Sequence, residues 1–309
     1  MRVVFFGTPD FATPTLRALI GEGHDVVAVV TQPDRPRRRA HAQLEPSPVK
    51  AAALEEGIPV LQPERPRGDA FMAALRALEP DVGVVVAYGH ILPREVIDLP
   101  PMGTFNVHAS LLPRYRGAAP IQAAVRDGCT ETGVTVQRMV EQLDAGPVVL
   151  ALPTTIPPDE TAGELTLRLS ELGATAMIEA LVLLELGQAA EVAQDAALAT
   201  YAAKVDREQA RIHWEAPAAQ VQAVIRAYDP RPGAWTTLAG LEVRCFGAKV
   251  LPAMSGEPGA VLEAGSAGVV VGCGAGAVSI AEVHPAGRKR VTAVEWARGR
   301  GVSVGQRFE

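Results

Sequence analysis

The sequence is poor in cysteine, in aromatic residues and in long apolar runs, and these shortages exclude whole classes of protein. Its three cysteines, Cys129, Cys245 and Cys273, are far apart and odd in number, so we predict neither a disulfide framework nor a zinc site. No apolar run approaches the roughly 20 residues of a membrane span, and the apolar start before Gly7 lacks the length and cleavage site of a signal peptide. We therefore expect a protein of the reducing cytoplasm, with no membrane partner and no metal. We also expect it to be a monomer.

Charge is unevenly distributed along the chain, although the net charge of −6 is modest. Residues 1–206 hold 17 Lys+Arg against 26 Asp+Glu, or −9, whereas residues 207–309 hold 12 against 9, or +3. An acidic body followed by a mildly basic tail leaves room for a nucleic-acid partner, although an asymmetry of this size also arises by chance.

Apolar runs alternate with helical patterns over the first part of the chain. The runs cover residues 3–6, 26–30, 58–61 and 82–86, and Ser47-Pro48 has the residue types of a helix start, with Ser as N-cap. Continuous hydrophobic strands between helices are typical of a parallel sheet covered on both faces. The sequence therefore predicts an α/β fold with a mostly parallel sheet.

The pattern changes after residue 187. A long helix is predicted over 161–186, with Thr161 and Glu164 forming a capping box, and an Ala-rich, weakly patterned stretch follows it. Beyond a helix at 218–227, short strands separated by glycine turns suggest a small β-barrel. We predict a catalytic domain over 1–187, a linker over 188–205 and a C-terminal domain over 206–309.

The candidate chemistry lies between residues 106 and 144. Asn106 and His108 are two apart, so on an extended segment both side chains point to one face. An amide and an imidazole together suit acyl transfer, because both can donate to a developing oxyanion. Asp144 could orient and charge-stabilise His108. The alternative is structural, with Asn106 capping a turn and His108 an ordinary loop histidine.

No serine, cysteine or lysine stands in a nucleophile elbow, which favours direct attack by a substrate amine over a covalent acyl-enzyme. The Gly7-Thr8-Pro9-Asp10 turn follows a strand, but it is not the glycine pattern of a dinucleotide site. We interpret it as a turn, with a phosphate contact as the second reading.

Two groups of basic residues are candidates for a phosphate-binding surface. Arg35, Arg37, Arg38 and Arg39 have no acid between Asp34 and Glu45, and a second group follows in the C-terminal part, comprising Arg288, Lys289, Arg290, Arg298 and Arg300. Both could contact a nucleic-acid backbone. Ordinary solvated charge remains the alternative for each.

Several segments together resemble the methionyl-tRNA formyltransferase family. They are FFGTPDFA at 5–12, VVTQPDRP at 29–36, PSPVK at 46–50, VVAYGHILP at 85–93, NVHASLLPRYRGAAPIQ at 106–122, TGVT and LDAGPV within 132–148, YAAKVDREQARIHW at 201–214 and IRAYDPRPGAW at 225–235. The His-x-Ser-Leu-Leu-Pro core is shared by folate-dependent formyltransferases in general. The PSPVK segment and the C-terminal segments narrow the resemblance to the tRNA enzyme.

The resemblance implies a Rossmann-like formyltransferase domain followed by an OB-like barrel. It also implies formyl transfer from 10-formyltetrahydrofolate, a co-substrate, to initiator methionyl-tRNA. Asn106, His108 and Asp144 would form the catalytic set, and the folate site would comprise Ser110, Leu111, Leu112 and Pro113, with Ile91 and Leu92 near the pterin. The tRNA would lie against Arg37, Arg38, Arg39 and the 288–290 group.

Two departures from the family pattern stand out. The loop after residue 36 has arginine and alanine where the family is rich in glycine and lysine, and Arg231 replaces a common aromatic. Two rival functions remain open. One is a formyltransferase acting on a small amine, such as a glycinamide ribonucleotide or an amino-sugar nucleotide, and the other is a non-catalytic RNA-binding module.

Overall fold

The computed structural model describes residues 1–36, 44–266 and 268–309, and the chain divides into two compact units. Unit 1 contains Met1–Gly117, Thr132–Thr154 and Thr166–Tyr201, and unit 2 contains Ala118–Glu131, Thr155–Leu165 and Ala202–Glu309. Two short segments from the first part of the chain thus belong to unit 2, and all residues from Ala202 onward belong to it as well. The linear domain boundaries at 187 and 206 stay a prediction.

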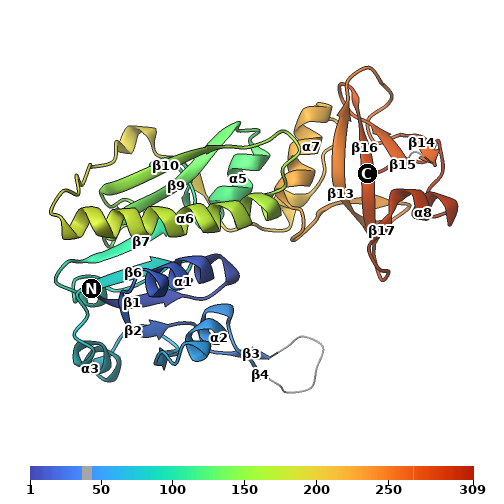
Figure 1. Ribbon diagram of the computed structural model, residues 1–309. Helices are drawn as coiled ribbons and strands as arrows, with labels where there is room; N and C mark the ends of the chain where they lie inside the picture. Colours follow the sequence, from blue (N-terminus) through green and yellow to red (C-terminus); the bar gives the residue numbers. More distant parts are fainter. Residues whose placement is uncertain (37–43, 267) are drawn as a thin grey trace. The chain divides into compact units, whose positions relative to one another are not determined.

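Unit 1 is built on a seven-stranded sheet with the order β10-β9-β7-β6-β1-β2-β5 (Figure 1). Strand β1 pairs in parallel with β2 and β6, β2 pairs in parallel with β5, and β6 pairs in parallel with β7, whereas β7 and β9 run antiparallel. The strands are β1 (Arg2–Gly7), β2 (Asp25–Val30), β5 (Val60–Leu61), β6 (Val82–Val86), β7 (Thr104–His108), β9 (Glu131–Arg138) and β10 (Val148–Thr155). The predicted α/β fold with a mostly parallel sheet is confirmed.

The helices begin where local signals place them. Ser47 caps α2 (Pro48–Glu55), its side chain accepting a hydrogen bond from the Lys50 amide at 3.1 Å. At the start of α6 (Ala162–Glu185), the Thr161 hydroxyl accepts from the Glu164 amide and the Glu164 carboxylate accepts from the Thr161 amide, which confirms the capping box. The remaining helices of unit 1 are α1 (Thr13–Gly21), α3 (Asp69–Ala77) and α4 (Arg94–Ile97), with the short 3-10 turns η1 (Asp10–Ala12) and η2 (Ala196–Leu198).

Helix α6 packs closely against strand β7. A Cβ on Gly173 of α6 would lie 2.9 Å from Cγ1 of Val107, so this helix approaches the strand as closely as a residue without a side chain allows. Because successive residues of a strand point to opposite faces, Asn106 and His108 point away from α6. The strand lies in a stretch where the sequence pattern alone indicated no element.

Unit 2 contains the antiparallel sheet β12-β13-β16-β15-β14, with β17 paired to β16. Its strands are β12 (Ala234–Leu238), β13 (Leu241–Leu251), β14 (Val261–Gly265), β15 (Gly268–Gly272), β16 (Ala277–Pro285) and β17 (Val291–Thr292). Helix α7 (Ala218–Ala227), at the predicted bounds, packs with α5 (Pro120–Arg126) and β13, and α8 (Ala293–Arg298) follows β17. This confirms the predicted small OB-like β-domain.

Short pairings and turns complete the described chain. They are β3 (Arg35–Pro36) with β4 (Leu44–Glu45), β8 (Arg116–Gly117) with β11 (Tyr201–Ala202), and the turn η3 (Glu208–Ala210). Over the described residues, none of the helices combines the length and the apolar character needed to traverse a lipid bilayer.

Candidate active site

The site is built at the end of strand β7. In register with β9, Asn106 lies opposite Gln137 and His108 lies opposite Thr135. His108 is buried and Asn106 is half-buried. The predicted shared face is therefore present, and it is bordered by the neighbouring strand on one side and by the loop after β7 on the other.

His108 is held through one ring nitrogen. Its Nε2 lies 2.9 Å from the carbonyl oxygen of Tyr115, and since a carbonyl only accepts, Nε2 carries the proton in this contact. Its Nδ1 lies 3.7 Å from Oδ2 of Asp144, which is longer than a hydrogen bond. The Tyr115 carbonyl thus fixes the ring, and Asp144 acts on it as a nearby charge. A second proton on Nδ1 would face that carboxylate.

Among the described residues, the hydrogen bonds to the Asp144 carboxylate come from neutral groups. Its Oδ2 accepts from the amide of Gly117 at 2.8 Å, and its Oδ1 accepts from Nε2 of Gln137 at 3.1 Å. Its backbone lies in the left-handed region with φ 48°, a conformation that aspartate tolerates better than most residues. The loop turns tightly here, since a Cβ on Gly146 would fall 1.7 Å from the carbonyl oxygen of Arg138.

The side chain of Asn106 has no hydrogen-bond partner among the residues that the structure describes. A half-buried amide beside a fixed imidazole and a carboxylate leaves one donor group available to a substrate oxygen. Such a donor can stabilise charge that develops on an acyl oxygen during transfer.

Two polar residues at the site were missed by sequence reasoning. Gln194 lies next to Asp144, and its side chain accepts from the buried Arg116. Arg116 occurs in the motif that carries the resemblance, but nothing in its spacing indicated this contact. Gln194 lies in the Ala-rich stretch predicted to be a linker, where no periodicity offered a signal.

The predicted folate residues fall into two kinds. Ser110 is fully buried, with its hydroxyl donating to the Arg114 carbonyl at 2.6 Å, and Leu92 is 3% exposed within the core of unit 1. Ile91 is 84% exposed, and residues 111–113 are partly exposed. The Ser110 and Leu92 side chains therefore support the site from beneath, whereas residues 91 and 111–113 have surface that a ligand can contact.

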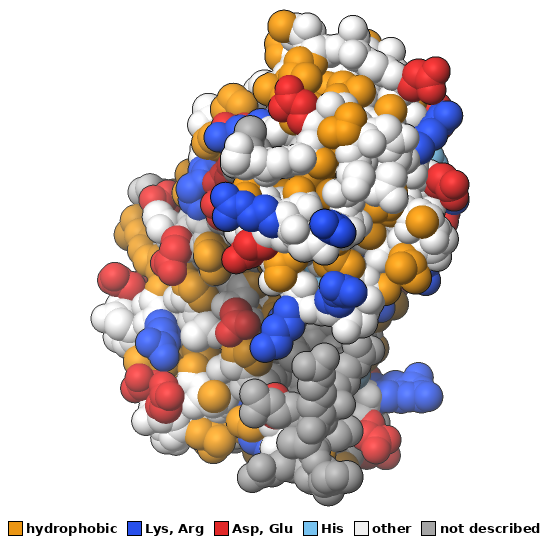
Figure 2. Space-filling view, turned by 90° about the vertical axis from the view of Figure 1, so that its right-hand side faces the viewer, with side chains coloured by type: hydrophobic (Ala, Val, Ile, Leu, Met, Phe, Trp, Pro, Cys, Tyr) orange, Lys and Arg blue, Asp and Glu red, His pale blue; other side chains and the backbone are white. Residues whose placement is uncertain are grey.

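The predicted tRNA-binding residues differ in whether an acidic side chain pairs with them. Arg290 pairs with Glu282 and lies 3.6 Å from Asp229 and 3.8 Å from the Phe246 ring, while Arg288 and Lys289 are exposed. Figure 2 shows a face on which Lys and Arg side chains lie at separate places with Asp and Glu among them. Arg37, Arg38 and Arg39 lie outside the described residues.

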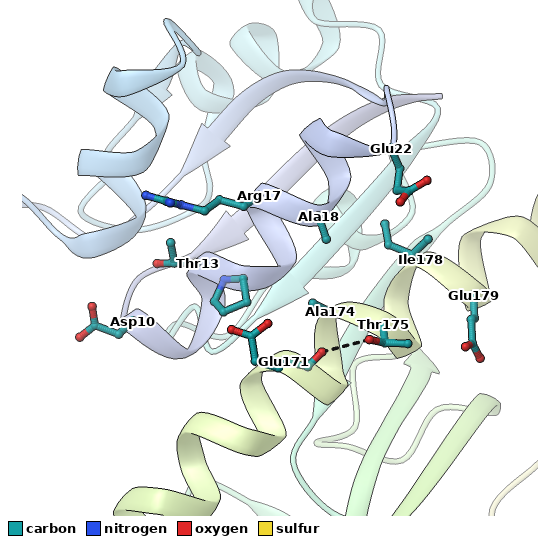
Figure 3. A pocket seen from close by; sticks show the side chains of 11 residues that line it. Asp10, Thr13, Arg17, Ala18, Glu22, Glu171, Ala174, Thr175, Ile178 and Glu179 are labelled. Carbon is teal, nitrogen blue, oxygen red and sulfur yellow. Dashed lines mark hydrogen bonds between the residues drawn. The ribbon is translucent and has the colours of Figure 1, made fainter.

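Unit 1 has a further hollow of about 870 Å³ between α1 and α6 (Figure 3). It is lined by the carboxylates of Asp10, Glu22, Glu171 and Glu179 together with Arg17, which also pairs with Glu55. None of the predicted site residues lines it.

Neither the two buried thiols nor the metal-ligating side chains of the described residues form a second centre. Burial raises the pKa of Cys245 to about 12 and that of Cys273 to about 11, so both remain thiols at neutral pH. Over residues 1–36, 44–266 and 268–309, no group of three His, Cys, Asp or Glu side chains is arranged to hold a metal ion.

The comparisons with known proteins agree over nearly the whole chain. The formyl transferase family model matches residues 1–181, and the model of the formyl transferase C-terminal domain matches residues 204–301. A methionyl-tRNA formyltransferase of Moorella thermoacetica is 47% identical over 97% of this chain and 96% of its own length. A methionyl-tRNA formyltransferase of Aromatoleum aromaticum is also 47% identical, covering 100% of this chain and 97% of its own length.

A similar fold occurs in a solved structure, HypX from Aquifex aeolicus in complex with tetrahydrofolic acid, with a TM-score of 0.65 at 21% identity. The match covers 97% of this chain but 47% of HypX, so the chain spans about half of that protein. At this identity the likeness concerns the fold alone.

Proposed function

Because this chain belongs to the methionyl-tRNA formyltransferase family, we propose that it transfers the formyl group of 10-formyltetrahydrofolate to the α-amino group of initiator methionyl-tRNA. The product is N-formylmethionyl-tRNA for translation initiation, which is why we place the enzyme in the cytoplasm. The observation that carries the chemistry is the amide of Asn106, which has no hydrogen-bond partner among the described residues, beside a fixed His108 and the carboxylate of Asp144.

The mechanism follows from direct attack by the substrate amine. The α-amino nitrogen bonds to the formyl carbon, the bond from that carbon to the folate nitrogen breaks, and the proton lost by the amine balances the one taken up by the folate nitrogen. Asn106 donates to the formyl oxygen while it carries negative charge, and His108 adds a second donation when its Nε2 exchanges the Tyr115 carbonyl for that oxygen. Asp144 stabilises the charged ring and, directly or through a water, takes up the amine proton.

The two substrates would contact different surfaces. For folate, residues 111–113 and Ile91 are the exposed members of the predicted set, and Ser110 and Leu92 would shape the loop and strand end beneath them. For tRNA, Arg288 and Lys289 have charge that no described acid neutralises. Arg37, Arg38 and Arg39 remain the second predicted contact with its phosphates.

The rival functions have less support. A small-amine formyltransferase leaves the C-terminal domain without a role, although that domain is included in the match to relatives that act on methionyl-tRNA by name. A non-catalytic RNA-binding module would make the arrangement of Asn106, His108 and Asp144 accidental.

A formylation assay with charged initiator tRNA and 10-formyltetrahydrofolate tests the proposal. We expect rapid formylation of methionyl-tRNA and none of free methionine or of a small aminated nucleotide. Equal turnover with free amines would contradict the tRNA assignment, and no transfer to any amine would contradict the enzyme assignment.

A further inference from the structure

Gln194 connects the predicted linker to the backbone around Asp144. Its Nε2 lies 2.9 Å from the carbonyl oxygen of Asp144 and 2.7 Å from that of Gly146. The same nitrogen lies 3.2 Å from Oε1 of Gln137, the residue whose Nε2 donates to the Asp144 carboxylate. One amide group therefore contacts both the main chain of the loop and the side chain that orients its carboxylate.

The orientation of the Gln194 amide is unambiguous. Its Oε1 accepts from Nε and Nη2 of Arg116 at 3.1 and 2.7 Å. A guanidinium can only donate and a carbonyl can only accept, so the oxygen must face Arg116 and the nitrogen must face the loop. Arg116 is 4% exposed, which means that water competes little for these contacts.

The chain around Gln194 is itself anchored to unit 1. Glu191 pairs with Nε and Nη2 of Arg138, and this pairing holds the pKa of Glu191 below its ordinary value. Val192 exchanges two backbone hydrogen bonds with Val148, at 2.8 and 2.9 Å. The segment thus presents Gln194 from a fixed backbone.

We propose that Gln194 is a positioning residue: the buried Arg116 orients its amide, and the amide holds the loop of Asp144 in its active conformation. The inference rests on the proposed function, because it concerns the carboxylate assigned to that reaction. Asp144 needs such support, since its backbone occupies the left-handed region and its carboxylate lies 3.7 Å from the imidazole. Without the Gln194 amide, the carbonyls of Asp144 and Gly146 lose a donor and the loop is free to shift.

The expected effect is on turnover. A displacement of about 1 Å at a reacting group costs up to about 100-fold in rate. In Gln194→Glu, one carboxylate oxygen still accepts from Arg116, but the other faces two carbonyl oxygens without a hydrogen to donate. We expect kcat to fall roughly 10- to 100-fold, with KM for both substrates within about twofold.

Gln188→Glu is the matched control. Gln188 lies in the same segment, it is exposed, and the same substitution adds the same charge away from the site. We expect its kcat and KM to equal those of the wild type. Should Gln194→Glu fail to fold, Gln194→Ala replaces it in every comparison, because it removes the amide without adding charge.

Combination with Asp144→Asn separates positioning from general structural damage. If Gln194 acts through Asp144, adding Gln194→Glu to Asp144→Asn should lower single-turnover formylation little further. Multiplicative losses, or a Gln194→Glu enzyme with wild-type kcat, would overturn the inference. The wild-type assay distinguishes the two failures: an inactive wild type overturns the proposed function, whereas an active wild type with a fully active variant overturns this inference alone.

Discussion

Two aspartates of unit 1 show how the same residue type serves different ends. Asp34 and Asp144 each accept a hydrogen bond at Oδ1 from a glutamine side chain, from Gln62 at 2.8 Å and from Gln137 at 3.1 Å. They differ at the other oxygen. Oδ2 of Asp34 accepts from the ammonium of Lys50 at 2.5 Å, whereas Oδ2 of Asp144 accepts from a backbone amide.

This difference decides what each carboxylate can do. The hydrogen bonds from Lys50 and Gln62 lower the pKa of Asp34, and the ammonium neutralises its charge. Asp34 thus links the chain just after β2 to Lys50 of α2 and to Gln62, which follows β5. Among the described residues, no lysine or arginine bonds to the carboxylate of Asp144, so its charge is left to act on the His108 ring. A carboxylate held by neutral donors is oriented without being neutralised, which suits a functional group.

The largest expected effects follow from removing the His108–Asp144 pair. His108→Ala should lower kcat by roughly 10²–10³, the range for losing one oriented donor, and Asp144→Asn should approach the same loss. The double variant should be little worse than the worse single one, because the two groups act together. Steady-state and single-turnover formylation measure this, and fully multiplicative losses would mean that Asp144 does not act through His108.

Asn106→Ala should reduce kcat by a similar factor of roughly 10²–10³ while leaving the stability of the fold intact. The reason is that no described group bonds to the Asn106 amide, so its removal leaves no partner unsatisfied. Urea unfolding measures the stability of the variant, and formylation kinetics on the same preparation measure its kcat. A stable variant with wild-type turnover would remove Asn106 from the catalytic set.

In the C-terminal basic group, Arg290 is paired with acids, whereas Arg288 and Lys289 are not paired with any described acid. Replacing Arg288 and Lys289 together by Ala should weaken tRNA binding mostly at low salt, each lost phosphate contact flattening the slope of log K against log[salt] by roughly 0.7–0.9. Arg290→Ala should instead lower stability, because it leaves Glu282 and Asp229 without their cation. Binding titrations at several salt concentrations separate the two, and an unchanged slope in the double variant would exclude this surface.

The smallest effect is expected at Asp34. Asp34→Asn should lower the free energy of unfolding at pH 7 by roughly 1 kcal/mol, with kcat unchanged. Since the folded pKa of Asp34 lies below its ordinary value, its contribution is present above that ordinary value and disappears as pH falls through the folded one. The stability difference between wild type and variant should therefore shrink in acid, and urea unfolding at pH 7 and at pH 3 measures it.

Much of the fold could be predicted from local signals. The apolar runs identified β1, β2 and β6, and the caps at Ser47 and Thr161 placed the starts of α2 and α6 where the structure has them. Given an extended segment, the shared face of Asn106 and His108 also follows from strand periodicity, although the sequence pattern did not indicate strand β7 itself. These features depend on residues that are near one another in the chain, so the sequence determined them by itself.

Other features were decided only by the tertiary structure. Gln194 meets Arg116 across 78 residues and Asp144 across 50, and neither pairing has a local pattern. No local pattern predicted the ion pair between Arg290 and Asp229 either. Leu92 is buried and its neighbour Ile91 is exposed, although the sequence analysis assigned both to the folate site. The sequence determines which hydrogen bonds and charges a side chain can offer. Which groups it bonds to depends on distant segments that come together only on folding.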